Sequence, residues 1–288
     1  MVMTYRQALI WGNGFLRENG IEEGSDARVL LCHAAQTDSL RLAVCANEQI
    51  DDKAYEKYKE YILRRSQNEP VSYITGEREF MGINFKVKPG ILIPRPETEH
   101  LVEFCMENLP DNAKIIDLCT GSGAIAVSLA KYLENARITA VDISDEAIEV
   151  ATLNAKENKV SDRVNVVKAN ALKKTDFGTK FDAVVSNPPY IPNEVVLTLD
   201  RDVKDFEPHL ALCGGDDGLD FYRAITKNAV PMLNPGGLLV YEVGYDQAEQ
   251  VAQIMSADFI DINFVKDLAG INRVVYGRLA ATSGKEVI

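Results

Sequence analysis

The second half of the chain alternates between short apolar runs and amphipathic segments, and this alternation limits the possible folds more than any other feature. Seven apolar runs predict strands, at residues 114–118, 137–141, 164–169, 181–186, 237–243, 259–266 and 273–279. Helical periodicity falls between the early ones, at residues 124–133, 145–159, 219–232 and 246–255. Strands joined by helical crossovers predict a mostly parallel sheet with helices on both faces. Residues 268–272 leave room only for a turn, so the last strand must pair antiparallel with the strand before it.

The residues before this pattern are helical and then form a hairpin. The segment 51–65 places tyrosines on one side of a helix, with basic residues around them. We interpret it as an amphipathic helix with a solvated basic face; a docking surface for a macromolecular partner is the alternative. Alternating residues at 80–88 predict a hairpin closed near Pro89-Gly90. The sequence thus predicts a helical N-terminal domain at 1–75, a β-hairpin linker at 76–95 and an α/β domain at 96–288.

A glycine-containing turn follows the first predicted strand of the α/β domain. Cys119, Thr120, Gly121, Ser122 and Gly123 lie between this strand and the next predicted helix. Glycines let a backbone approach a ligand closely, and the helix N-terminus offers free N–H groups. Asp142, at the end of the next strand, is spaced to accept hydrogen bonds from ribose hydroxyls. This arrangement predicts a nucleoside-containing cofactor across the C-terminal ends of the strands.

Two cofactors compete for this site. Residues 121–126 (GSGAIA) also fit the G-x-G-x-x-A form of the dinucleotide fingerprint, which keeps an NAD-dependent enzyme among the alternatives. Asp117, just before the turn, would repel a pyrophosphate but suits the ammonium group of a methionine moiety. S-adenosylmethionine is therefore favoured, and a turn or capping role is the alternative for Asp117.

The predicted strand at 181–186 ends in Ser-Asn-Pro-Pro-Tyr-Ile, which by itself would be a turn. In an open parallel sheet, however, ligands bind beyond the carboxyl ends of the strands. Pro188 makes Asn187 extended, and the two prolines direct a main-chain carbonyl outward. The Asn187 side chain and the Pro188 carbonyl can then accept hydrogen bonds from a planar N–H₂ group, with Tyr190 as a flat surface. Such a site suits methylation of an amide or exocyclic amine, without a metal or a strong base.

Charge and cysteine usage narrow the partners. The chain of 288 residues has 31 basic and 43 acidic residues and a net charge of −12, which disfavours binding to nucleic-acid phosphates. Five scattered cysteines without a C-x-x-C pair favour reduced thiols in a cytoplasm. We expect no signal peptide, no membrane span and no metal site, since the three histidines lie far apart.

Four segments, in this order, resemble the release factor glutamine N5-methyltransferase family: IPRPETE at 93–99, DLCTGSGAIAV at 117–127, VSNPPYI at 185–191, and DVKDFEPHLAL with GGDDGLDFYR at 202–223. The resemblance spans essentially the whole chain. NPPY alone is shared with DNA adenine and some RNA methyltransferases, whereas all four segments together are highly specific. The resemblance implies a class I S-adenosylmethionine-dependent methyltransferase: a Rossmann-like, seven-stranded, mostly parallel sheet with an antiparallel last strand, plus a small helical N-terminal domain for substrate docking.

The activity implied by the resemblance is methyl transfer from S-adenosylmethionine to the glutamine amide of the Gly-Gly-Gln loop in peptide chain release factors, which modulates translation termination. Its product would be S-adenosylhomocysteine. The implied catalytic and substrate-binding residues are Asn187, Pro188, Pro189 and Tyr190. The implied cofactor-binding residues are Asp117, Cys119, Thr120, Gly121, Ser122, Gly123, Asp142, Asn170, Ala171 and Asn187.

Two positions depart from the family pattern. Cys119 stands where the family usually has glycine, and a left-handed backbone suits cysteine poorly. Asn170 and Ala171 stand where an acid and often an aromatic residue contact adenine. Asn170 can still accept a hydrogen bond from the adenine amine, but Ala171 offers no stacking face. We therefore expect cofactor binding to persist more weakly.

Three alternatives remain open. A ribosomal-protein glutamine methyltransferase shares these motifs but tends to continue NPPY with Val-Asp, where this chain has Ile191-Pro192. A DNA or RNA amino-methyltransferase is disfavoured by the acidic charge and by the lack of a basic recognition insert. A non-catalytic cofactor-binding protein is disfavoured by the intact NPPY. We expect a cytoplasmic monomer that binds release factors, forms no stable complex with nucleic acid and does not contact a membrane.

Overall fold

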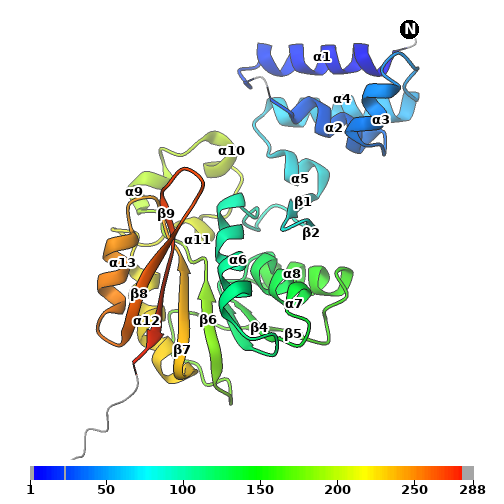
Figure 1. The fold of residues 1–288 in the computed structure, drawn as a ribbon. Helices are drawn as coiled ribbons and strands as arrows, with labels where there is room; N and C mark the ends of the chain where they lie inside the picture. The colour runs from blue at the N-terminus through cyan, green and yellow to red at the C-terminus, as the bar shows by residue number, and fades with distance from the viewer. Residues whose placement is uncertain (1–2, 23, 281–288) are drawn as a thin grey trace, which may run out of the picture. The chain divides into compact units, whose positions relative to one another are not determined.

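The computed structural model describes residues 3–22 and 24–280, which divide into two compact units (Figure 1). Among these residues, the first unit runs to Glu77 and includes Asp200–Phe206, and the second unit holds the rest. Each unit has a hydrophobic core of its own. Each is therefore described by itself.

The first unit is helical, and side-chain caps fix where its helices begin. Thr4 and Gln7 form a capping box, in which the Thr4 hydroxyl accepts from the Gln7 N–H and the Gln7 side chain accepts from the Thr4 N–H. Asp38 and Asp51 cap two further helices, each with a side-chain oxygen that accepts from backbone N–H groups of the first turn. The helices are α1 (Tyr5–Glu18), α2 (Asp26–Ala34), α3 (Ser39–Val44), α4 (Asp52–Ser66), α5 (Val71–Thr75) and α10 (Arg201–Lys204).

The core of this unit forms where α1, α2 and α4 meet. Tyr58 and Ile62 are buried on one face of α4, which confirms the predicted amphipathic helix, while Lys53 and Lys57 are exposed on the other. Helix α1 lies close to α4 at Gly12, where an added Cβ would be 1.9 Å from the Tyr58 hydroxyl oxygen. Only glycine fits this position between α1 and α4.

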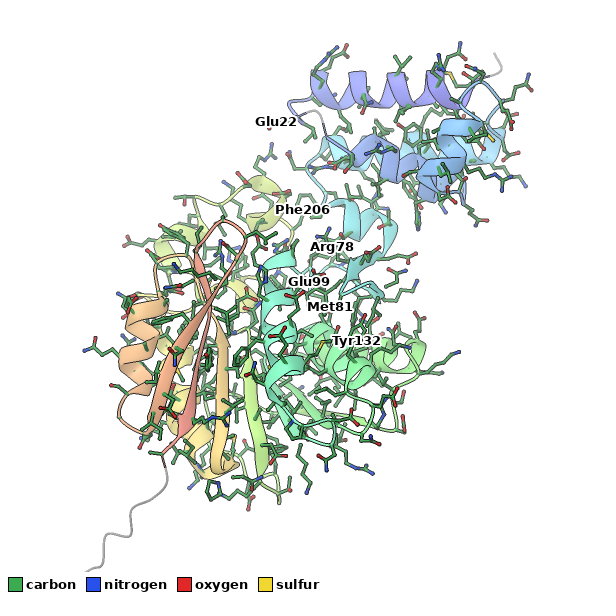
Figure 2. The ribbon with its side chains drawn as sticks, viewed as in Figure 1. Glu22, Arg78, Met81, Glu99, Tyr132 and Phe206 are labelled. Atoms are coloured by element: carbon green, nitrogen blue, oxygen red, sulfur yellow. The ribbon has the colours of Figure 1, made fainter. Side chains whose placement is uncertain are left out.

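The predicted hairpin is present, but its turn lies elsewhere. Strands β1 (Glu77–Phe80) and β2 (Ile83–Lys86) are joined at Met81 and Gly82, so the expected closure near Pro89-Gly90 is wrong. Met81 and Gly82 both have positive φ, which gives the tight reversal. The Met81 N–H donates to Glu99 over 2.7 Å and the Tyr132 hydroxyl donates to the Met81 carbonyl over 2.5 Å, so the hairpin packs on the helices of the second unit (Figure 2).

The second unit is built on a seven-stranded sheet with the order β5-β4-β3-β6-β7-β9-β8. The first five strands in this order are parallel, and β9 is antiparallel to both β7 and β8. The predicted mostly parallel sheet with an antiparallel last strand is confirmed. The strands are β3 (Lys114–Leu118), β4 (Arg137–Asp142), β5 (Val164–Lys168), β6 (Phe181–Ser186), β7 (Leu233–Glu242), β8 (Phe259–Lys266) and β9 (Asn272–Leu279).

Helices cover both faces of this sheet (Figure 1). Ile115 and Ile116 on β3 point to opposite faces and enter different core clusters. One face is covered by α6 (Glu99–Asn108), α7 (Ala124–Tyr132) and α8 (Asp145–Glu157), the other by α12 (Asp220–Met232) and α13 (Ala248–Met255); the short helix η1 (Pro96–Thr98) precedes α6. The short helices α9 (Asn193–Val196) and α11 (His209–Leu212) lie between β6 and α12.

The strand order creates a crevice at the carboxyl ends of β3 and β6. From β3 the chain moves outward to β4 and β5, then returns to β6 on the other side of β3. Leu118 is in register with Ser186, and the Ser186 hydroxyl donates to the Leu118 carbonyl over 2.6 Å. The loops that leave these two strands therefore diverge from one point, which is where open α/β sheets bind ligands. Within the described residues, no helix has the length and apolar character needed to cross a membrane.

Candidate active site

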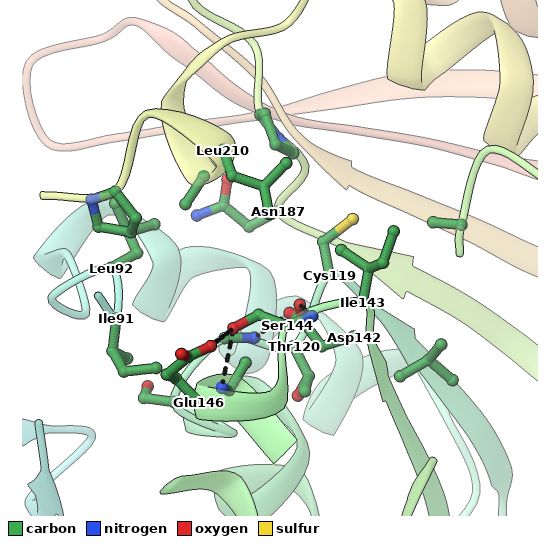
Figure 3. A pocket seen from close by; sticks show the side chains of 18 of the residues that line it. Ile91, Leu92, Cys119, Thr120, Asp142, Ile143, Ser144, Glu146, Asn187 and Leu210 are labelled. Carbon is green, nitrogen blue, oxygen red and sulfur yellow. Dashed lines mark hydrogen bonds between the residues drawn. The ribbon is translucent and has the colours of Figure 1, made fainter. Parts of the chain in front are cut away.

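A cavity of about 590 Å³ lies in the second unit at this crevice (Figure 3). Its walls come from the loops after β3, β4, β5 and β6, from residues 89–98 and from residues 208–211. This volume is ordinary for a small-molecule or cofactor site. The predicted site residues that line it are Cys119, Thr120, Gly121, Ser122, Asp142, Asn170, Ala171, Asn187 and Pro189.

The turn after β3 is held by the strand beside it. The Gly121 N–H donates to an Asp142 carboxylate oxygen over 2.9 Å, and the Thr120 N–H donates to the Val141 carbonyl over 3.0 Å. Gly123, the N-cap of α7, has a φ of +80°, and a Cβ there would lie 3.1 Å from the Ala151 Cβ. Gly123 therefore serves the close approach of α7 and α8 and does not line the cavity.

Cys119 occupies the position where glycine was expected, and its φ is +64°. The loop therefore does require the left-handed conformation that a cysteine tolerates poorly. For a residue with a Cβ, this conformation costs about 1–2 kcal/mol. The thiol lines the cavity (Figure 3). Burial raises its pKa, and the charges of Asp142 and Asp117 raise it further, so the thiol is neutral at pH 7.

Asp117 lies beneath the turn and is completely buried, so it does not line the cavity. The Thr120 hydroxyl donates to one of its carboxylate oxygens over 2.5 Å; the other oxygen makes no hydrogen bond within the protein, although the Ala126 N–H lies close enough to lower the pKa of the group. Burial raises the pKa of Asp117 to about 7, against the hydrogen bond from Thr120. An unpartnered buried carboxylate oxygen is costly unless a donor completes it. A cationic ligand group that reaches beneath the turn would do so.

Asp142 is held from both sides. One carboxylate oxygen accepts from Gly121, and the other accepts from the Ser144 N–H over 3.0 Å. Each oxygen keeps a further lone pair, so the carboxylate can still accept hydroxyl donors from the cavity. These two hydrogen bonds from backbone N–H groups fix the orientation of the Asp142 carboxylate, which forms part of the cavity wall (Figure 3).

The loop after β5 uses Asn170 mainly for its own turn. The Asn170 side-chain oxygen accepts from the Leu172 N–H over 2.9 Å, and the Ala171 carbonyl accepts from the Asn228 side chain over 3.0 Å. Ala171 offers no aromatic face, as expected from the sequence. However, Phe221 on α12 and Ile143 after β4 line the same cavity, and neither was predicted from the sequence. An aromatic residue at the start of a helix after a glycine-rich loop was the available signal for Phe221.

The segment Asn187–Tyr190 is fixed by contacts on both sides. The Tyr190 carbonyl accepts from the Gln247 side chain over 2.8 Å, and Ile191 exchanges backbone hydrogen bonds with Leu212 and Gly214 over 2.9 Å each. A Cβ on Gly214 would lie 2.7 Å from the Tyr190 Cα, so the two backbones are in close contact. This explains how a proline-rich strand end keeps a single conformation.

The four residues of this segment do not all face the cavity. Asn187 and Pro189 line it, whereas Pro188 and Tyr190 do not. Burial raises the pKa of the Tyr190 hydroxyl, and the Tyr190 ring lies against Gly244 after β7. The structure therefore places Asn187 in contact with the cavity, while Tyr190 packs behind it.

Residues before α6 complete the cavity wall. Arg95 lines the cavity, and its guanidinium forms an ion pair with the buried Glu207 over 2.5 Å. This pair connects two segments that are far apart in the sequence, before η1 and before α11. Among the described residues, no three His, Cys, Asp or Glu side chains gather as a metal site would need.

Comparison with known proteins gives the family. Residues 7–76 match the family model described as the PrmC N-terminal domain, and residues 96–200 match the methyltransferase small domain. The chain is 42% identical to a release factor glutamine methyltransferase from Clostridium acetobutylicum, over 95% of this chain and 98% of that one. It is 40% identical to the protein of the same name from Clostridium botulinum, over 96% and 99%.

The fold also matches a solved structure. A methyltransferase from Pyrococcus furiosus aligns with a TM-score of 0.53 at 19% identity, over 77% of this chain and 99% of that one. At this identity the likeness concerns the fold alone. The two clostridial relatives, which this chain matches over nearly their full length, establish its family. The chain belongs to the release factor glutamine methyltransferase family.

Proposed function

We propose that this protein transfers a methyl group from S-adenosylmethionine to the side-chain amide nitrogen of the glutamine in the Gly-Gly-Gln loop of peptide chain release factors, and so modulates translation termination. The observation that carries the proposal is the register of β3 with β6, which joins the turn at 119–123 to Asn187 at one cavity. The names of the relatives support the choice of substrate.

The residues around the cavity fit the proposed cofactor. The unpartnered oxygen of Asp117 would accept from its ammonium group, and Asp142 would accept from its ribose hydroxyls. Phe221 and Ile143 would give the adenine apolar surface. When bound, S-adenosylmethionine supplies the methyl carbon: its N–C bond to the amide forms as its C–S bond breaks, a thioether is left, and the amide nitrogen gives one proton to solvent.

The protein's own part is to hold a poor nucleophile in line. An amide nitrogen shares its lone pair with the carbonyl, so the nitrogen must become pyramidal before it can attack. Hydrogen bonds from the amide N–H₂ to the Asn187 side-chain oxygen and to the Pro188 carbonyl would favour that change. They would strengthen as positive charge develops on the nitrogen. Hydrogen bonds at the Tyr190 carbonyl and at Ile191 restrain the backbone next to both proposed acceptors, although Pro188 itself does not line the cavity.

The helical first unit is the proposed docking part for the release factor. Its α4 exposes lysines on the side away from the core. We infer that the protein acts as a monomer in the cytoplasm and forms no stable complex with nucleic acid, in line with its net charge of −12.

The test is a substrate panel with methyl-labelled S-adenosylmethionine. The purified protein is incubated with a release factor, with the same factor carrying asparagine in place of the Gly-Gly-Gln glutamine, with ribosomal protein and with DNA. We expect one labelled methyl group per release factor, located in the Gly-Gly-Gln peptide, and none in the asparagine variant. Label in DNA, label in ribosomal protein alone, or no label at all would contradict the proposal.

A further inference from the structure

The orientation of the Asn187 side-chain amide is set by two neighbouring groups, Glu242 and Thr98, of which Thr98 also lines the cavity. The Asn187 N–H₂ group donates to the Thr98 hydroxyl oxygen over 3.1 Å. The Glu242 carboxyl group lies beside both side chains: Tyr241, the residue before it on β7, is in register with Ser186, the residue before Asn187, and the Thr98 and Asn187 side chains both lower the pKa of Glu242. Since the Thr98 hydroxyl accepts from Asn187, its single proton is left for donation to the neighbouring Glu242 carboxylate. The bond to Thr98 engages the amide nitrogen and leaves the amide oxygen for the cavity.

Glu242 is an unusual residue for its place. It is the last residue of β7, beside β6, and only 2% of its surface is exposed. One carboxylate oxygen has no partner within the protein. The charges around it are Glu97 and Arg273, and Arg273 is already paired with Asp267 over 2.9 Å. A buried acid without a full ion pair weakens a fold, and an apolar residue of similar size would pack there at lower cost.

We propose that Glu242 is a positioning residue for methyl transfer: with Thr98 it holds the Asn187 amide with its N–H₂ group inward and its oxygen toward the cavity. The inference rests on the proposed function, because it explains how Asn187 becomes an acceptor for the substrate amide. Glu242 also supplies a negative charge next to Asn187. A carboxylate behind the Asn187 amide polarises it, so that the amide oxygen accepts more strongly as the substrate nitrogen becomes positive.

The proposal makes the ionised form of Glu242 the active one. A carboxylate polarises the Thr98 hydroxyl and the Asn187 amide through its negative charge, whereas a protonated carboxyl has lost that charge. Burial raises the pKa of Glu242 to about 7, while the hydrogen bonds from Thr98 and Asn187 and the charge of Arg273 oppose the rise and Glu97 adds to it. The Tyr190 and Tyr222 hydroxyls lie near the same group. Methyl transfer should therefore decline as the pH falls below about 7.

Two variants test this role, with a control at the other end of the sheet. Glu242→Gln keeps the shape but removes the charge and adds a donor, and Thr98→Val removes the bridging hydroxyl. Asp182→Asn is the matched control: this carboxylate accepts from Lys114 and Asn234 at the start of β6, away from the cavity. Each protein is measured for kcat on release factor from pH 6 to pH 8 and for cofactor Kd by calorimetry. Circular dichroism checks that each variant is folded.

We expect Glu242→Gln to lower kcat by about 10- to 100-fold, as loss of a partner behind a site residue commonly does, with cofactor Kd changed by less than about 3-fold. Its kcat should no longer decline below neutral pH. Thr98→Val should act in the same direction, and the double variant should lose far less than the product of the two single effects. Asp182→Asn should keep the wild-type kcat and pH profile. A Glu242→Gln variant with wild-type kcat and the same pH profile would overturn the inference while leaving the proposed function intact.

A second measurement does not need the methylation substrate. The side-chain N–H₂ protons of Asn187 are observed by nitrogen-15 NMR and identified by their loss in Asn187→Ala. We expect both protons to exchange slowly with solvent and their shifts to follow a titration that Glu242→Gln abolishes. Fast exchange with no titration would show the N–H₂ group facing the cavity and would overturn the inference. Slow exchange in a protein that labels no release factor would instead refute the proposed function alone.

Discussion

The amino and carboxyl ends of β3 and β6 differ in the burial and hydrogen bonding of their acidic side chains. At their amino ends, the exposed Lys114 donates its N–H to Asp182 over 2.9 Å, and Asn234 donates to the other Asp182 oxygen over 2.7 Å, so this carboxylate is complete and close to solvent. At their carboxyl ends, Asp117 and the neighbouring Glu242 are buried, and each has one oxygen without a partner in the protein. The backbone there also includes the left-handed Cys119.

This difference separates what the fold needs from what the site needs. The amino ends follow the usual rules for a stable surface, with satisfied polar groups and ordinary backbone. The carboxyl ends combine buried acids and a strained residue, which lower stability unless a ligand completes them. The comparison predicts that substitutions at the amino ends change stability alone. Substitutions at the carboxyl ends should change ligand affinity, and some of them should raise the stability of the free protein.

The largest expected effect on cofactor affinity belongs to Asp142→Ala. Its carboxylate holds the Gly121 and Ser144 N–H groups and is proposed to accept from the ribose, so its loss removes the ribose acceptor and loosens the turn. We expect cofactor Kd to rise by at least about 30-fold, equivalent to about 2 kcal/mol, measured by calorimetry. Asp182→Ala is the control and should leave cofactor Kd unchanged. An equal rise in cofactor Kd for both substitutions would contradict the proposed difference between the two ends of the strands.

Asp117→Asn should stabilise the free protein and weaken cofactor binding. Because burial raises the pKa of Asp117 from 3.8 to about 7, the folded protein binds this proton more tightly than the unfolded chain. The free energy of unfolding therefore falls as the pH rises between these values, and the loss is complete above about pH 7. Asparagine has no such titration, so the variant should gain about 1–3 kcal/mol over the wild type at pH 8 and much less at pH 5.

Urea unfolding of both proteins at the two pH values measures this gain. Cofactor Kd should rise by about 10-fold in Asp117→Asn, because asparagine cannot offer a negative charge to an ammonium group. A stability difference that is the same at pH 5 and pH 8 would mean that Asp117 does not titrate in this range. Unchanged cofactor affinity would remove its proposed role.

The smallest effect is expected at Cys119. Glycine adopts the φ of +64° without a steric cost but loses more entropy on folding, so Cys119→Gly should raise the free energy of unfolding by about 0.5–1 kcal/mol. Lys159, after α8, has a φ of +61° and lies outside the cavity, which makes Lys159→Gly the matched control. Both should be stabilised, and only Cys119→Gly should change cofactor affinity, by about 3-fold or less. Destabilisation of Cys119→Gly alone would show that packing of the thiol outweighs the backbone strain.

The sequence predicted the sheet well because its strands are bounded by the apolar runs themselves. The runs at 114–118, 181–186 and 259–266 coincide with β3, β6 and β8. The hairpin turn was misplaced because Pro89-Gly90 is the stronger local turn signal, whereas Met81-Gly82 is stabilised by contacts with Glu99 and Tyr132 that are distant in the sequence. Local patterns cannot report such contacts.

The sequence predicted some of the residues at the cavity and missed others. Residues on the loops after β3, β4 and β6 were found because the motif and the strand ends coincide. Thr98, Phe221 and Glu242 were missed, since only the tertiary fold brings them to Asn187 or to the cavity. One signal for Glu242 was present: it ends an apolar strand with a carboxylate, as Asp142 does. The direction in which Tyr190 faces could not be predicted from the sequence.

The central claim is that Asn187 acts on the substrate amide and not mainly on the cofactor. Asn187→Ala tests it when cofactor Kd and the single-turnover rate of methyl transfer to release factor are measured on the same preparation. We predict a cofactor Kd within about 3-fold of wild type and a transfer rate lower by at least about 100-fold, as for loss of one group that stabilises developing charge. A transfer rate within a few-fold of wild type, or a fall in rate fully explained by weaker cofactor binding, would contradict the account.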